Sequence, residues 1–252
     1  MRAIVLAGGK GTRLAPYTTV LPKPLMPIGD MPILDVVLRQ LAAVGYDEIT
    51  LAVGYLAELL MAYCGDGSRY GVRLTYSREE TPLGTAGPIA LVPDVDQTFL
   101  VMNGDLLTTL DYGSMLKFHE SRGNIATVAT IAREVVIDLG VIEAADDRVV
   151  AYREKPRFSY AVSAGIYLFE PAILEHIPKG ERFDLPDLII ALLDRGLTVG
   201  SFASTSEWLD IGRPDDYEEA VRVFESRRQA YVPDVATDAE AQTSGGRAQV
   251  DQ

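Results

Sequence analysis

The sequence predicts an α/β protein with a mixed, mostly parallel central sheet, on two observations. In the first half of the 252-residue chain, short apolar runs typical of buried strands alternate with segments of helical periodicity. Parallel sheets covered by helices on both faces are built from this alternation. The second half is richer in short strand-like runs, which indicates a mixed sheet. The expected architecture is therefore a Rossmann-like three-layer sandwich.

The first half supplies most of the predicted parallel strands and the helices that cross between them. Continuous apolar runs predict strands at 3–7, 49–53, 72–76 and 99–102. Between them, helices are expected over 33–44, 57–64 and 112–122. In the first of these helices the apolar residues recur three and four positions apart, which places them on one face.

The second half supplies shorter strands and two further helices. Strand-like runs lie at 125–131, 140–142, 149–152, 165–169, 198–202 and 208–211. Helices are expected over 185–194 and 214–228, the latter with Pro214 in its first turn. From 232 onward the composition turns to Asp, Ala, Thr, Gln and Gly without periodicity. We therefore predict a domain over 1–230 and a flexible C-terminal tail over 231–252.

Composition limits the partners of this chain. The net charge of −13 argues against nucleic acid and anionic membrane surfaces, and no apolar run approaches the roughly 18 residues of a membrane helix. The lone cysteine, Cys64, excludes an intrachain disulfide and fits a cytoplasmic location. Homo-oligomerisation is compatible with these features. The two histidines, His119 and His176, stand outside any motif, and we expect them at surface or helix-capping positions.

A glycine-rich loop directly follows the first predicted strand. It reads Gly8-Gly9-Lys10-Gly11-Thr12-Arg13. Glycines allow backbone N–H groups to close around phosphate oxygens, and the guanidinium of Arg13 adds a forked, permanent charge. The spacing differs from that of the dinucleotide fingerprint and of the Walker A loop. Taken alone, the segment is equally well explained as a tight strand-to-helix turn.

A second cationic group follows ten residues later. Lys23 stands between Pro22 and Pro24, and these prolines hold the backbone around it extended and stiff. An isolated lysine of this kind is an ordinary loop residue. After a loop that contains glycines and an arginine, it is better interpreted as a second phosphate-binding group.

The two segments together strongly resemble the sugar-phosphate nucleotidylyltransferase family, over about residues 1–225. The residues in these motifs are most similar to those of mannose-1-phosphate guanylyltransferases. The resemblance implies an Mg²⁺-dependent enzyme that joins a nucleoside triphosphate to a sugar 1-phosphate, giving an NDP-sugar and pyrophosphate. Its implied catalytic residues are Arg13, Lys23, Asp105 and Asp210. Its implied nucleotide-binding residues are Leu6, Ala7, Gly8, Gly9, Gly11, Thr12, Arg13, Glu80, Gly84 and Thr85.

Two aspartates are candidates for a metal site. Asp105 follows the apolar run 99–102, at the carboxyl end of a predicted strand, where open α/β sheets bind ligands. Asp210 lies between apolar residues, where an unpaired carboxylate would be costly. Mg²⁺ is bound in proteins by one or two carboxylates together with phosphates and waters. The resemblance assigns both residues to the metal; a turn or a helix cap is the alternative for each.

The resemblance also implies a sugar-phosphate site, formed by Gly140, Glu154, Lys155, Ser163 and Gly165. A carboxylate at Glu154 would accept sugar hydroxyls, and the ammonium of Lys155 would pair with the phosphate. The alternative for these two is a surface ion pair. Ser163 replaces the asparagine usual in the family, and its hydroxyl is shorter with a single donor, so the sugar contact at this position differs from the family's.

The segment 82–87 resembles the part of the family that lines the nucleobase. Gly84 would allow backbone groups to reach the base edge, and Glu79 or Glu80 could accept from the N1–H and amino groups of guanine. A solvated acidic turn is the alternative for these glutamates. The resemblance of segment 82–87 favours guanine as the base, with mannose or a related hexose or heptose as the sugar.

The expected chemistry is in-line attack of the sugar phosphate on the α-phosphorus. The attacking oxygen is already anionic at neutral pH, so no general base is required, and the protein must align two anions and screen their repulsion. Two other functions remain open from the sequence. One is an NDP-sugar-dependent glycosyltransferase, although Asn103-Gly104-Asp105 lacks the first acid of a DxD pair. The other is a non-catalytic, NDP-sugar-binding regulatory module.

Overall fold

The structure is a computed structural model that describes residues 1–233. The tail predicted over 231–252 lies outside the described residues from position 234 onward. Within the described part of the chain, no helix is long and apolar enough to span a bilayer.

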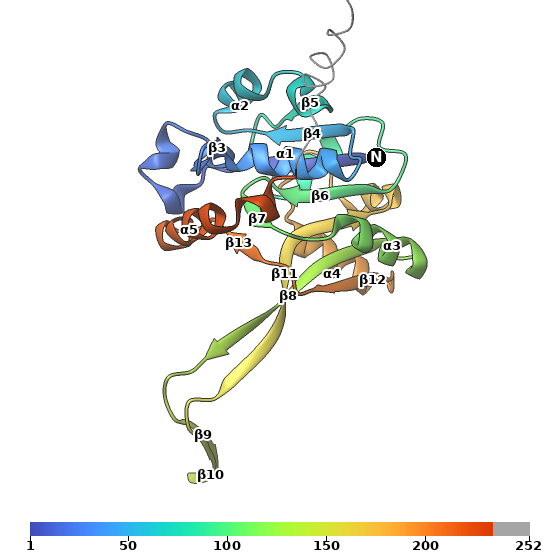
Figure 1. Ribbon diagram of the computed structural model, residues 1–252. Coiled ribbons are helices and arrows are strands. Elements are labelled where there is room, and N and C mark those ends of the chain that lie inside the picture. The colour runs from blue at the N-terminus through green and yellow to red at the C-terminus, as the bar shows by residue number, and fades with distance from the viewer. Residues whose placement is uncertain (234–252) are drawn as a thin grey trace, which may run out of the picture.

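A seven-stranded sheet in the order β12-β8-β11-β6-β1-β4-β5 forms the centre of the molecule (Figure 1). Its strands are β1 (Arg2–Ala7), β4 (Glu48–Val53), β5 (Arg73–Arg78), β6 (Phe99–Asn103), β8 (Ala126–Val136), β11 (Arg157–Phe169) and β12 (Val199–Ser204). Strand β1 pairs in parallel with both β4 and β6, and β11 is antiparallel to both β6 and β8. The predicted mixed, mostly parallel sheet is confirmed.

Helices cover both faces of this sheet. They are α1 (Ile33–Ala43), α2 (Ala57–Cys64), α3 (Tyr112–Arg122), α4 (Leu185–Asp194) and α5 (Pro214–Tyr231). Ala3 and Val5 of β1 pack into one apolar cluster with residues of α1, α2 and α3. Ile4, between them, packs on the opposite face in a cluster with Leu188 of α4. Burial on both faces explains why β1 is continuously apolar, and the predicted three-layer sandwich is confirmed.

Helix α5 and four short strands form a third apolar cluster beside the sheet, which contains Leu107, Ile211 and Phe224. The strands are β2 (Pro27–Ile28), β3 (Met31–Pro32), β7 (Leu106–Thr108) and β13 (Trp208–Asp210). Strand β13 pairs antiparallel with β7, and this register sets Asp210 opposite Leu106. Two segments about a hundred residues apart are thereby joined next to the end of β6.

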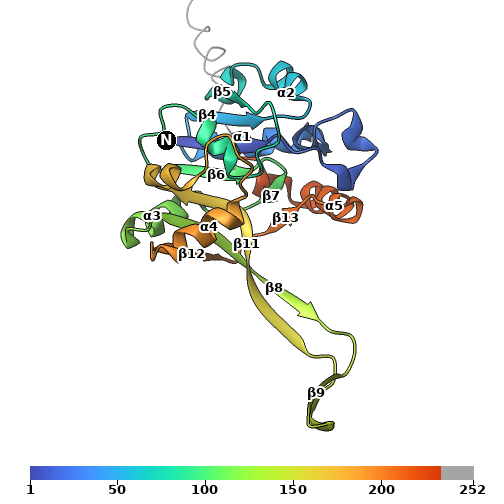
Figure 2. The same ribbon diagram turned by 180° about the vertical axis from the view of Figure 1, so that it is seen from behind.

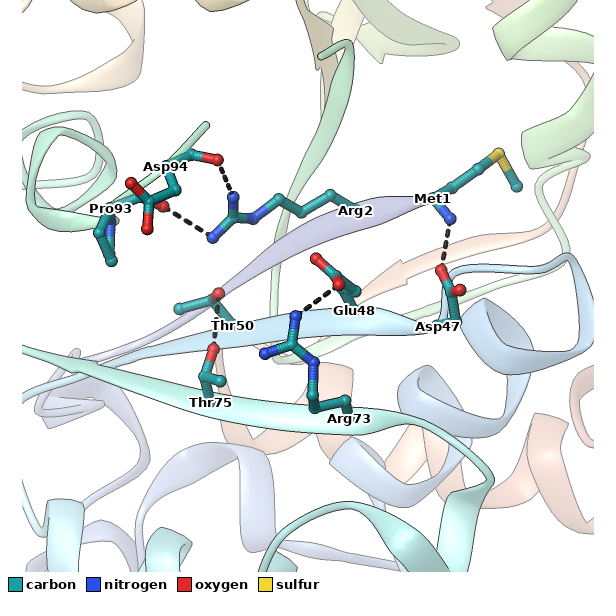
Figure 3. Close-up of polar contacts among 9 residues, drawn as sticks. All are labelled: Met1, Arg2, Asp47, Glu48, Thr50, Arg73, Thr75, Pro93 and Asp94. Atoms are coloured by element: carbon teal, nitrogen blue, oxygen red, sulfur yellow. Dashed lines mark hydrogen bonds and ion pairs between the residues drawn. The ribbon is translucent and has the colours of Figure 1, made fainter. Parts of the chain in front are cut away.

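The amino ends of β1, β4 and β5 are tied together by polar contacts (Figure 3). The guanidinium of Arg2 donates to the carbonyl oxygen of Pro93 at 2.8 Å and also to that of Asp94. The Thr50 and Thr75 hydroxyls lie 2.9 Å apart. These contacts fasten the end of the sheet opposite to the one where ligands bind in such folds.

A long two-stranded arm projects from the sheet. Strands β8 and β11 remain paired as far as Val136 and Arg157, and the chain between them ends in a hairpin of β9 (Val141–Ala145) and β10 (Arg148–Arg153). Both views show the arm leaving the body of the molecule (Figure 2). The strands predicted at 125–131 and 165–169 are therefore shorter than the observed β8 and β11. For β11, the first residues alternate between apolar and polar, so they do not form the continuous apolar run that predicts a strand.

Candidate active site

The glycine loop is fastened to the segment that carries Lys23. Gly11 has a left-handed backbone (φ 61°), and a β-carbon there would lie 2.9 Å from Thr18 Cγ2 and 3.3 Å from Lys23 Cβ. Only glycine fits this conformation and this contact without strain. The hydroxyl of Thr18 donates to the carbonyl oxygen of Gly11 at 2.8 Å. The loop is therefore held directly against the segment that carries Lys23.

Lys23 lies between the two aspartates singled out in the sequence. It begins a short 3-10 helix, Lys23–Leu25, after the extended Pro22, and its side chain is only 9% exposed. Its ammonium forms an ion pair with Asp105 and lies 3.8 Å from Oδ1 of Asp210. A buried charge is tolerated when it is paired in this way.

Arg13 completes this group from the other side of Asp210. A β-carbon on Gly212 would lie 3.4 Å from Arg13 Nη1 and 3.3 Å from Asp210 Oδ2, so the guanidinium and the carboxylate face the same small space. Burial raises the pKa of Asp210; Lys23 and Arg13 counteract this shift, while Asp105 adds to it. We refer to Arg13, Lys23, Asp105 and Asp210 as the charge cluster.

The charge cluster fits a divalent cation with few protein ligands. No group of three or more His, Cys, Asp or Glu side chains suitable for a metal occurs among residues 1–233. Two carboxylates are nevertheless enough for Mg²⁺, which takes its remaining ligands from phosphates and water. The Lys23 ammonium between Asp105 and Asp210 is a stand-in cation that shows the affinity of this position for positive charge.

A large cavity of about 1150 Å³ opens at the other end of the glycine loop. Six residues predicted to bind the nucleotide line it: Leu6, Gly8, Gly9, Glu80, Gly84 and Thr85. Four others do not line it: Ala7, Gly11, Thr12 and Arg13. Of these, Gly11 faces Lys23 and Arg13 faces Asp210. The loop thus has a cavity at its beginning and the charge cluster at its end.

Polar contacts that the sequence did not indicate hold the wall of this cavity. Asp184, at the start of α4, accepts hydrogen bonds from the backbone N–H of Thr85 at 2.9 Å and from its hydroxyl at 3.3 Å. Glu79 accepts from the backbone N–H of Leu83 at 2.9 Å. The segment around Gly84 is therefore fastened at both ends. Asp184 gave no signal in the sequence because its partner lies 99 positions away.

The predicted sugar-phosphate residues divide between two places. Ser163 and Gly165 lie at the base of the arm: a β-carbon on Gly165 would contact Asn103 Nδ2 at 2.8 Å, and the hydroxyls of Ser163 and Tyr167 are 2.9 Å apart. The Ser163 hydroxyl is therefore within hydrogen-bond distance of a residue of the same strand, β11.

Gly140, Glu154 and Lys155 lie instead on the outer part of the arm. Lys155 pairs with Asp138 at 2.7 Å, and Glu154 accepts from the hydroxyl of Tyr152 at 2.8 Å. The structure does not bring these residues to the charge cluster, because the pairing of β8 with β11 carries them away from the body (Figure 2). Of the charged residues predicted to bind phosphates or metal, Arg13, Lys23, Asp105 and Asp210 therefore come together within one chain, whereas Lys155 does not.

The glycine loop follows a buried parallel strand and adjoins both the cavity and the charge cluster, in a Rossmann-like α/β fold. Residues 2–227 match the family model described as nucleotidyl transferase, and the chain belongs to that family. The family resemblance found in the sequence is thereby confirmed.

Two relatives and one solved structure illustrate which proteins are similar to this chain. A UTP–glucose-1-phosphate uridylyltransferase of Synechocystis sp. is 38% identical over 248 residues, covering 90% of this chain and 64% of that protein. A mannose-1-phosphate guanylyltransferase of Mycobacterium tuberculosis is 36% identical over 222 residues, covering 85% and 62%. This chain therefore spans less than two thirds of either relative.

The solved structure is that of a putative glucose-1-phosphate thymidylyltransferase from Bacillus anthracis. It superposes with a TM-score of 0.72 at 24% identity, covering 88% of this chain and 94% of that one. At this level of identity the likeness establishes the fold.

Proposed function

We propose that the protein transfers a nucleotidyl group from a nucleoside triphosphate to a sugar 1-phosphate, releasing pyrophosphate. The charge cluster carries this proposal, because a buried lysine held against two carboxylates at the end of a glycine loop suits the handling of phosphates. The two relatives described above are named as a uridylyltransferase and a guanylyltransferase of sugar 1-phosphates, which are enzymes of this reaction class. The single cysteine supports a cytoplasmic location.

Each group in the cluster has a defined task in this reaction. The glycine loop binds phosphate oxygens through its backbone N–H groups. Arg13 stabilises the negative charge that develops on the departing pyrophosphate, and Lys23 binds oxygens near the α-phosphorus. Asp105 and Asp210 would hold Mg²⁺, which supplies further positive charge to the phosphates. The sugar phosphate needs no deprotonation, and no side chain in the cluster has to accept a proton.

The cavity lined by Gly84 and Thr85 is proposed to hold the nucleobase. Glu80 is exposed at its rim and free to meet a donor edge, whereas Glu79 is engaged by the backbone of Leu83. A carboxylate favours guanine, and we propose GTP with a hexose 1-phosphate of the mannose type as the first pair to test. UTP with glucose 1-phosphate is the second pair, in view of the uridylyltransferase relative.

A pyrophosphate-release assay that crosses five nucleoside triphosphates with hexose and heptose 1-phosphates tests the reaction class. Arg13→Ala and Asp105→Asn should each lower kcat about 10²–10³-fold, as the loss of one donor to developing charge does elsewhere. Arg195→Ala, an exposed change at the end of α4, is the control. Near-normal turnover in Arg13→Ala, or consumption of an NDP-sugar without pyrophosphate chemistry, would overturn the proposal.

A further inference from the structure

The wall of the cavity that contains Gly84 and Thr85 is tied to the start of α4 by hydrogen bonds that run in both directions. The backbone N–H of Thr85 donates to Oδ1 of Asp184 at 2.9 Å. In return, the backbone N–H of Leu185 donates to the hydroxyl oxygen of Thr85 at 2.7 Å. We refer to these two hydrogen bonds as the reciprocal cap. Each side chain accepts from a backbone donor that lies about a hundred positions away in the sequence.

Asp184 is free for this contact because its own helix does not use its carboxylate. The residue occupies the N-cap position of α4, yet its side chain forms no hydrogen bond to that helix. An N-cap carboxylate normally accepts from the second or third backbone N–H of its helix. The second residue here is Pro186, which has no N–H, and the N–H of the first, Leu185, is already bound to Thr85. The carboxylate of Asp184 is therefore available to a distant segment.

Backbone contacts on either side of the reciprocal cap hold the two segments in register. The N–H of Phe183 donates to the carbonyl oxygen of Leu83 at 2.9 Å. The carbonyl oxygen of Phe183 accepts from the N–H groups of Ala86 and Gly87 at 2.9 and 3.0 Å. A β-carbon on Gly84 would lie 2.6 Å from that same carbonyl oxygen. The wall segment therefore lies in direct contact with the chain that leads into α4.

Helix α4 is itself fixed to the central sheet. Three of its leucines are buried in the apolar cluster that also contains Ile4 of β1: Leu185, Leu188 and Leu192. The same cluster contains Ile89, from the 3-10 helix that follows Thr85. A functional group is held more precisely by a packed helix than by a loop alone. The reciprocal cap therefore gives the irregular segment around Gly84 and Thr85 the fixed position of α4.

We propose that Asp184 is a positioning residue of the nucleotide site, which holds Gly84 and Thr85 in the geometry that contacts the nucleotide. The assignment of the cavity to the nucleotide rests on the proposed function, whereas the reciprocal cap rests on the contacts alone. Asp184 acts through Thr85 as a hydrogen-bond acceptor, so its charge is not required. Two other roles make different predictions: a residue that only stabilises α4, and a carboxylate in the cavity wall that contacts the ligand directly.

Nucleotide affinity in three variants separates these roles. Calorimetric titration with GTP, and with UTP in parallel, measures binding without sugar phosphate and without turnover. Asp184→Ala leaves the N–H of Thr85 without its acceptor and should weaken binding about 3–10-fold, as expected for one hydrogen bond. Asp184→Asn keeps an acceptor oxygen and should bind like the wild type. Asp187→Ala removes another carboxylate from the same turn of α4 and is the matched control.

Each result decides between the three roles. Asp184→Asn that binds as weakly as Asp184→Ala would show that the charge meets the ligand directly, and would overturn the proposal. Unchanged affinity in a folded Asp184→Ala with a lowered Tm would reduce the residue to a stabiliser of α4, and would also overturn it. In steady-state kinetics, Asp184→Ala should raise the KM for the nucleotide and leave kcat nearly unchanged, because the lost binding is common to the ground and transition states.

Amide hydrogen exchange, followed by NMR, tests the reciprocal cap itself. Thr85→Val keeps the shape of the side chain but removes the hydroxyl oxygen, so the amide of Leu185 should exchange faster. In the wild type, GTP should slow the exchange of the Leu185 amide, and this protection should shrink in Asp184→Ala. An unchanged rate for Leu185 in Thr85→Val would show that the two segments are not coupled, which contradicts the proposal.

The proposed function and the positioning role can fail separately. A wild type that binds GTP or UTP, with the weakening in Asp184→Ala, but releases no pyrophosphate with any sugar 1-phosphate would refute the reaction and leave the positioning role intact. Pyrophosphate release by both proteins with the same KM would refute the positioning role and leave the reaction intact. A wild type that binds no nucleoside triphosphate would overturn both.

Discussion

Replacement of Lys23 by methionine tests whether its ammonium takes the place of a bound cation. The side chain is 9% exposed and its partner Asp105 is 22% exposed. Removing one partner of such a buried pair costs about 3–5 kcal/mol. Asp210 is 41% exposed, so solvent screens its interaction with Lys23. We therefore use the lower limit, about 3 kcal/mol, for the loss of folding stability. For a chain of this size that loss lowers Tm by roughly 6–12 °C.

Divalent cation should reverse much of this loss. Without Lys23, Asp105 and Asp210 repel each other with nothing between them, and Mg²⁺ should stabilise the variant more than the wild type, because no ammonium competes for the carboxylates. Thermal unfolding followed by circular dichroism, with and without Mg²⁺, measures both effects. Lys179→Met removes an exposed lysine and is the control. A Tm within about 2 °C of wild type, or equal gains from Mg²⁺ in both proteins, would refute the reasoning.

Three further predictions concern single groups. Asp210→Asn should raise Tm at neutral pH while abolishing most turnover. Burial raises the pKa of Asp210 in the folded protein. The cost of its ionised form therefore develops as the pH rises above the unfolded-state pKa of about 3.9 and is complete above the folded-state pKa, so a melting series should show the gain vanish below about pH 4; a gain that persisted there would contradict this. Gly84→Ala should raise the KM for the nucleotide several-fold, because its φ is 81° and a β-carbon would meet the carbonyl oxygen of Phe183 at 2.6 Å; an unchanged KM would remove the segment from the base site. Burial raises the pKa of the Cys64 thiol to about 11, so a disulfide reagent should react only after denaturation, and rapid reaction of native protein would show that α2 opens.

Local sequence patterns were sufficient for most elements of the fold. Helices α2, α3 and α4 begin and end at the predicted residues, because the apolar spacing that predicts a helix is a property of neighbouring positions. The pattern was insufficient for β11, whose first residues alternate in polarity, and for His119. That histidine was expected at the surface or in a cap, yet it is 1% exposed, with its ring nitrogens 2.8 Å from the Thr127 hydroxyl and 3.0 Å from Glu170.

The amino-acid sequence by itself determined the family, the glycine loop and the identity of the charged residues. Only the tertiary structure decided how they meet. Asp210 reaches Asp105 through the pairing of β13 with β7, Thr85 is held by Asp184 from the start of α4, and Lys155 is carried outward by the arm. Contacts between distant segments depend on which surfaces pack together, and a pattern of neighbouring residues does not contain that choice.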